Sequence, residues 1–306
     1  MVHQHRSTGE RLRLAFFLTL IILAIELAGG VLSHSLALLS DAGHVFTDII
    51  ALGLAWFAAV QAGRPADASR TFGYHRTGIL AALANAATLI AIVAIIAVEA
   101  INRLQNPVTV TPGLMAIAAA AGIAVNLYIG YSLTRSETEN LNVRAATLHV
   151  FGDVASSGAV IAGAVVVYLT GWYPIDPLIS LFVAAVIARG AWSILRDTLR
   201  ILMESAPSDL DVSEMVADMR REPGIESVHD LHVWSLAGGM TYLTAHVQVT
   251  DGLLSQHDRL VGDLDCLLRD KYRIGHTTLQ LESVCCPRAD LYCDPQEQVA
   301  PGSHDH

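Results

Sequence analysis

The pentapeptide His44-Val45-Phe46-Thr47-Asp48 lies within an apolar stretch over residues 36–60, and it returns almost unchanged as His149-Val150-Phe151-Gly152-Asp153 within a second apolar stretch over residues 145–169. Each stretch is long enough for a helix to cross a bilayer, which takes about 20 residues. A charged side chain near the bilayer centre costs about 3 kcal/mol or more on insertion scales. Two copies of the same histidine and aspartate in such stretches therefore indicate a function.

The composition of the whole chain agrees with a membrane protein. Of its 306 residues, 53% are hydrophobic and 16% are charged, and a mean hydropathy of +0.45 is unusual for a soluble domain. The apolar residues are concentrated in six segments of suitable length for transmembrane helices, over residues 14–32, 36–60, 78–101, 114–133, 145–169 and 175–195. We therefore expect a membrane all-α bundle of six transmembrane helices, with both termini on one side.

Arginine placement predicts which side that is. Arginines precede the first span and occupy the second and fourth connections, whereas the connections over residues 106–113 and 171–176 have none. Cytoplasmic connections are the ones enriched in Lys and Arg. The N-terminus, the even connections and the C-terminal part are thus expected in the cytoplasm of a cell's inner or plasma membrane. The first apolar stretch lacks a clear cleavage site for a signal peptide and is expected to remain as a span.

The spacing of the repeated pair favours a metal site. On a helix, a His and an Asp four residues apart lie on one face, one turn apart. Two such helices facing each other supply four ligands: His44, Asp48, His149 and Asp153. Two nitrogens and two oxygens suit tetrahedral zinc, with cadmium or cobalt as alternatives, whereas an all-oxygen site would favour manganese, magnesium or calcium.

The sequence changes character after residue 204, and residues 205–306 contribute most of the formal net charge of −10. A helix is predicted from about residue 209, followed by strands over 227–236 and 241–250, a helix over 254–272 and a strand over 277–282. This α-β-β-α-β order indicates a small two-layer α+β domain, with an antiparallel sheet whose open face is a dimer or ligand surface. The expected divisions are a cytoplasmic N-terminal segment over residues 1–13, a transport domain over 14–204, a cytoplasmic domain over 205–284 and a tail over 285–306.

All four cysteines lie in this cytoplasmic part, where thiols are normally reduced, so disulfides are not expected. Cys266 lies in the middle of a helical pattern and is predicted to be a small core residue. Cys286 and Cys293 flank a short loop and are candidate metal ligands.

Four further polar residues lie in or near the predicted spans. Asp41 lies on nearly the same helix face as His44, where it either attracts cations or binds helix neighbours. Glu99 and Asn126 are interpreted as structural hydrogen-bonding residues. For Glu26, a structural role and a functional role both remain open.

Several motifs together resemble the cation diffusion facilitators, and the zinc-exporting branch fits best. The matching runs are SLALLSDAGH over residues 35–44, FGYHR over 72–76, NVRAA over 142–146 and VHDLHVW over 228–234, besides the paired H-x-x-x-D motifs. The resemblance implies a homodimer of six-helix protomers that exchange cytoplasmic metal for protons, with a ferredoxin-like cytoplasmic domain at the dimer interface. His44, Asp48, His149 and Asp153 match the transport site, and His44 favours zinc over manganese or iron.

The same resemblance implies metal sites in the cytoplasmic part, where zinc would have a structural or regulatory role. His229, His246 and Glu282 match one such site. His3 and His5 resemble an N-terminal segment that reaches the cytoplasmic cysteines of a partner subunit, here Cys286 and Cys293. Asp67, Arg70 and Tyr74 stand where some members have an Asp and two His in the second connection, so a metal site is not expected there.

Other classes of protein are weighed against transport. An intramembrane metalloenzyme would leave one metal position open for water, but the chain has no H-E-x-x-H or G-x-S-x-G motif, and four ligands close a tetrahedron. A membrane-tethered metal sensor would bind metal without flux. The sequence therefore predicts a zinc/proton antiporter that is not an enzyme, with the bilayer, metal and protons, but no nucleic acid, as partners.

Overall fold

The computed structural model describes residues 2–134, 141–252, 254–283, 291 and 292, and in residues 2–15, 132–134, 141–149, 254 and 255 it describes the backbone only. The described residues form two compact units. Residues up to 64 and residues 80–196 make up the first unit, and residues 65–79 with those from 197 onward make up the second.

Six long helices confirm the prediction of six spans. They are α1 (Val2–Ser33), α2 (Leu36–Ala62), α3 (Thr77–Gln105), α4 (Pro112–Thr134), α5 (Leu141–Thr170) and α6 (Ile175–Leu202). All six are long and apolar enough to cross a membrane. Several extend beyond the apolar segments by a turn or more, because a helix continues through polar residues as long as no breaker ends it.

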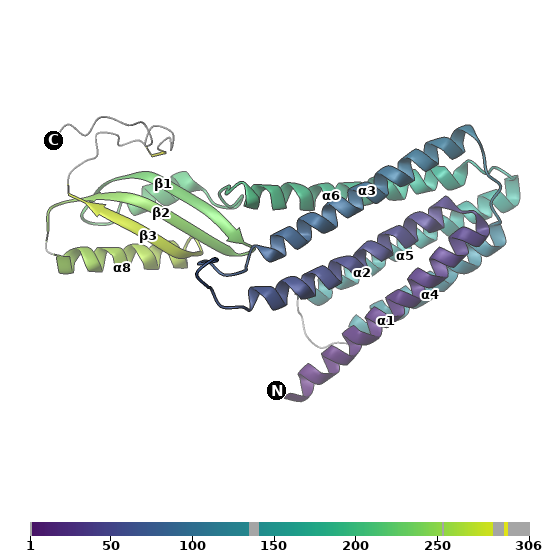
Figure 1. Ribbon diagram of the computed structural model, residues 1–306, viewed down its shortest axis with the longest axis horizontal. Helices are drawn as coiled ribbons and strands as arrows, with labels where there is room; N and C mark the ends of the chain where they lie inside the picture. Colours follow the sequence, from purple (N-terminus) through teal and green to yellow (C-terminus); the bar gives the residue numbers. More distant parts are fainter. Residues whose placement is uncertain (1, 135–140, 253, 284–290, 293–306) are drawn as a thin grey trace. The chain divides into compact units, whose positions relative to one another are not determined.

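The helices pack through small residues. Helices α1, α2, α4 and α5 gather in one group, while α3 and α6 run side by side (Figure 1). At Gly29 on α1, an added Cβ would stand 2.4 Å from the Cβ of Ala118 on α4, so only glycine permits this close approach. Large apolar side chains such as Trp56, Ile117 and Tyr168 point outward, as expected of a surface in contact with lipid.

An aspartate on α6 caps the beginning of α2. The buried carboxylate of Asp176 accepts hydrogen bonds from the Ser35 hydroxyl at 2.6 Å and from the backbone N–H groups of Leu36 and Ala37 at 2.7 and 3.3 Å. Ser35 is itself the N-cap of α2 and accepts from the N–H of Leu38. The free N–H groups of a helix N-terminus attract a carboxylate, so Asp176 fixes the start of the helix that carries His44 and Asp48.

The second unit contains an α+β domain in the predicted order. Its elements are α7 (Val212–Met219), β1 (Ile225–Ala237), β2 (Met240–Val249), α8 (Leu254–Asp270) and β3 (Ile274–Glu282), and the sheet order is β1-β2-β3. Strands β1 and β2 are antiparallel, but β2 and β3 are parallel. The prediction of a purely antiparallel sheet was therefore wrong. Helix α8 connects β2 to β3, and such a helical crossover lets the chain re-enter the sheet in the same direction.

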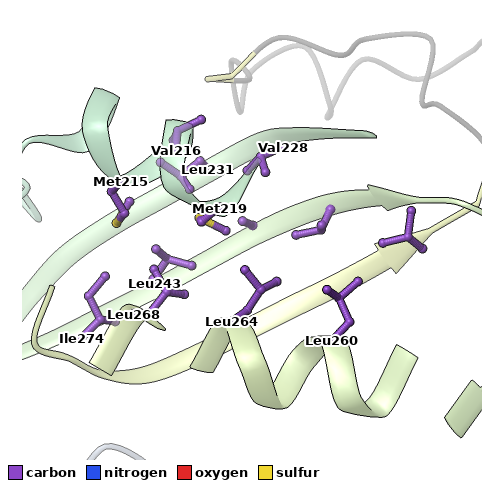
Figure 2. Packing of buried hydrophobic residues seen from close by; sticks show 13 residues of the cluster. Met215, Val216, Met219, Val228, Leu231, Leu243, Leu260, Leu264, Leu268 and Ile274 are labelled. Atoms are coloured by element: carbon purple, nitrogen blue, oxygen red, sulfur yellow. The ribbon is translucent and has the colours of Figure 1, made fainter. Parts of the chain in front are cut away.

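Two helices cover one face of this sheet and form its core (Figure 2). Side chains of α7 and α8 point toward apolar residues of the strands, and Leu264 and Leu268 are fully buried. The prediction that Cys266 belongs to this core was wrong, because its side chain is exposed. Leu260, Leu264 and Leu268 recur every four residues on the buried face, and a residue two positions from each lies on the opposite side of the helix.

Candidate metal sites

Three of the four residues predicted to form the transport site converge from α2 and α5. Nε2 of His44 lies 3.8 Å from Oδ2 of Asp48, one turn further along α2, and 3.9 Å from Oδ1 of Asp153 on α5. Two atoms that bind one tetrahedral zinc ion at about 2.0–2.2 Å stand roughly 3.3–3.6 Å apart. The observed separations are therefore within small side-chain movements of a shared metal ion. The side chain of His149, the fourth predicted ligand, lies outside the described part of α5.

Asp41 binds its helix neighbours. Its carboxylate is 2% exposed and accepts hydrogen bonds from the hydroxyls of Ser156 at 2.8 Å and Ser157 at 2.9 Å. Both serines lie on α5, one turn after Asp153, so this pair of bonds joins α2 to α5 beside the candidate ligands. The pairing could not be read from the sequence, where the only signal was two adjacent serines in an apolar span.

Glu99, Asn126 and Glu26 are the other polar residues considered in or near the spans. Glu99 accepts a hydrogen bond of 2.8 Å from Arg103 one turn later on α3, in agreement with its structural interpretation. Asn126 and Glu26 are buried. Glu26 packs so closely against α4 that a Cβ at Gly122 would stand 2.8 Å from its Oε1.

A second candidate site lies on the sheet of the α+β domain. His229 on β1 and His246 on β2 are directly opposite each other, and Glu282 ends the neighbouring strand β3. One potential ligand atom from each of the three lies within 4.8 Å of the others. Nδ1 of His246 is 2.8 Å from Oε1 of Glu282, and Nε2 of His229 is 3.3 Å from Oε2 of the same carboxylate. This juxtaposition of two imidazoles and a carboxylate is a donor set suited to zinc.

The state of His229 supports a ligand at this position. Its side chain is 1% exposed, and among the described residues its Nδ1 has no hydrogen-bond partner, while its Nε2 approaches Oε2 of Glu282 at 3.3 Å without forming a hydrogen bond. Buried polar atoms are nearly always bonded in native proteins, so these nitrogens of His229 fit a metal ion. The residues present therefore fit the zinc that the family resemblance implied.

Sequence analysis missed a fourth residue beside this site. Asp230 has a φ of 47° at an irregularity between the β1–β2 pairs of His229 and His232. Its carboxylate oxygens lie 3.6 Å from Nε2 of His246 and 3.1 Å from Nε2 of His232. The irregularity brings Asp230 to the same side of the sheet as His246, which strict alternation along a strand would not do. The H-D-L-H motif alone does not show that Asp230 lies on the same side of the sheet as His246, because that placement depends on the irregularity in the strand.

Other predicted ligands fall outside the description. The side chains of His3 and His5 belong to the part of α1 described by its backbone only, and Cys286 and Cys293 lie outside the described residues.

In the connection before α3, both carboxylate oxygens of Asp67 accept hydrogen bonds. One oxygen accepts from Ser69 and the N–H of Arg70, and the other accepts from the Tyr74 hydroxyl at 2.7 Å. These donors hold the pKa of Asp67 well below its usual range, with the Ser69 hydroxyl making the largest contribution. The absence of a metal site there stays a prediction.

Comparisons with known proteins cover both units. Family models described as the cation efflux transmembrane domain and the cation efflux protein cytoplasmic domain match residues 12–203 and 207–284. The zinc transporter ZitB of Shigella flexneri is 41% identical over 317 residues, covering 100% of both chains. The metal cation efflux system protein CzcD of Cupriavidus metallidurans is 39% identical over 94% of this chain and 91% of its own. A cadmium, cobalt and zinc/H(+)-K(+) antiporter of Bacillus subtilis is 36% identical over 100% of both chains. This chain therefore belongs to the cation diffusion facilitator family of cation efflux proteins.

Proposed function

We propose that this protein is a zinc/proton antiporter that exports cytoplasmic Zn²⁺, and also Cd²⁺ or Co²⁺, through a site made by His44, Asp48, His149 and Asp153. The observation that carries the proposal is the convergence of the His44 ring with carboxylates of both α2 and α5. Its zinc-transporting relatives, which match the chain along its whole length, support the choice of metal.

Metal and protons compete for the same atoms at this site. Zinc binds neutral imidazole and ionised carboxylate, so its binding displaces any proton from His44, Asp48 or Asp153. When the site is open to the near-neutral cytoplasm, metal binds and protons leave. When it is open to the other side, protonation of the same ligands lowers the affinity for metal. Alternating exposure of the site then couples inward proton movement to metal export.

The assembly belongs to the same proposal. Both termini and the α+β domain are cytoplasmic, in line with the positions of the arginines. Two chains form a homodimer through the α+β domain, and zinc held by His229, His246 and Glu282 stabilises or regulates that domain. Zinc held by these residues would cross-link the strands β1, β2 and β3, which carry them.

Zinc flux into sealed proteoliposomes under an imposed proton gradient tests the proposal. We expect the wild-type chain to accumulate zinc and Asp153→Ala to fall to background, because Asp153 supplies one ligand of the site. Glu99→Gln is the matched control, since it removes a carboxylate from α3 that is paired with Arg103, and it should retain flux. Zinc binding by the wild type without flux would refute transport in favour of a sensor, and full flux in Asp153→Ala would refute the assigned site.

A further inference from the structure

Glu26 is a buried carboxyl group that the transport site does not use. It lies on α1 within the candidate span Phe16–Ser33, and its side chain is 1% exposed. Within the described part of the chain, its Oε2 has no hydrogen-bond partner. The other oxygen faces Gly122, where any larger residue would collide with it. An ionised carboxylate that is buried with one oxygen lacking a hydrogen-bond donor is very unfavourable.

The neighbouring helices bring negative charge, not positive charge, to Glu26. An added Cβ at Gly122 would stand 2.8 Å from Oε1 of Glu26 and 3.7 Å from Oγ of Ser157, the hydroxyl that donates to Asp41. Glu26 therefore lies close to the Asp41 carboxylate, and Asp153 precedes Ser157 on α5 by one turn, as Asp41 precedes His44 on α2. Helix α4 contributes Gly122 and the neutral Asn126. Helices α2 and α4 contain no Lys or Arg, and the basic residues of α1 and α5 are confined to Arg6, Arg11, Arg13 and Arg144 near their beginnings. Among the described side chains of α1, α2, α4 and α5 there is therefore no Lys or Arg to neutralise Glu26.

Hydrogen bonding indicates which of the two carboxyl groups, that of Glu26 or that of Asp41, carries a proton. Two carboxylates that share a poorly solvated site cannot both ionise at low cost. Asp41 accepts from the hydroxyls of Ser156 and Ser157, and such bonds stabilise an anion. Glu26 has an oxygen without a donor. The anion therefore belongs on Asp41 and the proton on Glu26.

We propose that Glu26 is a proton carrier of the transport cycle, which releases its proton when metal enters the site of His44, Asp48 and Asp153 and regains it when the metal leaves. This inference rests on the proposed antiport function. A bound divalent cation neutralises Asp153 and adds positive charge nearby, so it lowers the cost of an ionised Glu26. The O–H bond of the Glu26 carboxyl group breaks, its electron pair stays on the carboxylate, and the proton leaves to solvent. The proton is counted in addition to those displaced from the metal ligands.

Proton release on zinc binding measures this directly. The full-length protein in detergent, in weak buffer with a pH-sensitive dye, is titrated with zinc, and protons released per zinc bound are compared between variants. We expect Glu26→Gln, which keeps the size of the side chain, to release up to one proton fewer per zinc than wild type. Glu99→Gln should release the wild-type number. The ratio of protons to zinc moved in proteoliposomes should fall in the same variant.

The two proposals fail in different ways. If the wild type moves zinc without proton counterflow, antiport itself is wrong. If the wild type exchanges protons for zinc and Glu26→Gln has an unchanged ratio, only the role of Glu26 is wrong. Should Glu26→Gln fail to fold, infrared difference spectra of the wild type and Glu26→Asp decide the matter. In both proteins, zinc should abolish the carbonyl band of a protonated carboxyl group, and the frequency of that band should differ between wild type and Glu26→Asp. A band that zinc leaves unchanged, or a band at the same frequency in both proteins, would overturn the inference.

Discussion

Removing the carboxylate that caps α2 should loosen the helix that carries His44 and Asp48, two of the proposed transport ligands. Asp176 accepts three hydrogen bonds, of which those from Ser35 and Leu36 are short, at 2.6 and 2.7 Å. Hydrogen bonds to charged groups contribute about 1.5–3 kcal/mol each. Asp176→Asn replaces one accepting oxygen by a donating amide, so it should destabilise the folded chain by about 1.5–3 kcal/mol, which is the loss of one such bond. For a unit of this size that is a fall in melting temperature of about 3–12 °C.

Thermal unfolding in detergent and zinc flux in proteoliposomes test this prediction together. Asp197→Asn is the matched control, because Asp197 lies on the same helix α6 but is exposed. We expect the control to melt within experimental error of the wild type, and Asp176→Asn to melt earlier and to transport zinc more slowly at temperatures where both are folded. A melting temperature for Asp176→Asn equal to that of the control would refute the capping argument.

Two further predictions concern the α+β domain and are measured on the full-length chain. Leu264→Ala should cost about 2–5 kcal/mol of stability, because it leaves a cavity at a fully buried position of α8, whereas Cys266→Ala on the exposed side of the same helix should stay within about 0.5 kcal/mol of wild type. Chemical denaturation followed by tryptophan fluorescence distinguishes the two variants, and equal losses of stability would contradict the assigned core. Asp218 accepts hydrogen bonds from Lys271 and Tyr272, and these bonds, with that from Lys271 the larger, hold its pKa below its usual value. Its contribution to stability should therefore be complete above the unfolded pKa of about 3.9 and be lost as the pH falls through the lower folded value. Asp218→Asn should weaken the dependence of unfolding on pH in this acid range, and an unchanged dependence would show that the bonds seen to Asp218 do not persist in solution.

The sequence was sufficient for the features that depend on local pattern. Six spans follow from the length of apolar segments, because a bilayer leaves only one way to satisfy the backbone of such a segment. The order of helices and strands after residue 204 follows from the change between periods of 3.6 and 2 residues. Repetition of H-x-x-x-D placed His44 beside Asp48 on one helix face without any tertiary information.

Local pattern was not sufficient for the features that join distant segments. The prediction of a core position for Cys266 failed because the buried face of a helix depends on which element packs against it, and on α8 the leucines face the sheet instead. The direction of β3 depends on the α8 crossover, while a period of two residues is the same in parallel and antiparallel strands.

The sequence by itself determined the six apolar spans and the placement of His44 and Asp48 on one helix face, since hydrophobic length and helical spacing are properties of each segment alone. The tertiary structure decided which segments meet: Asp153 approaches His44, serines of α5 donate to Asp41, Asp176 caps α2, and Asp230 turns toward His246 at a bulge. These contacts depend on the close packing of helices and on strand register. Both are set by many weak interactions along the whole chain, and no single motif encodes them.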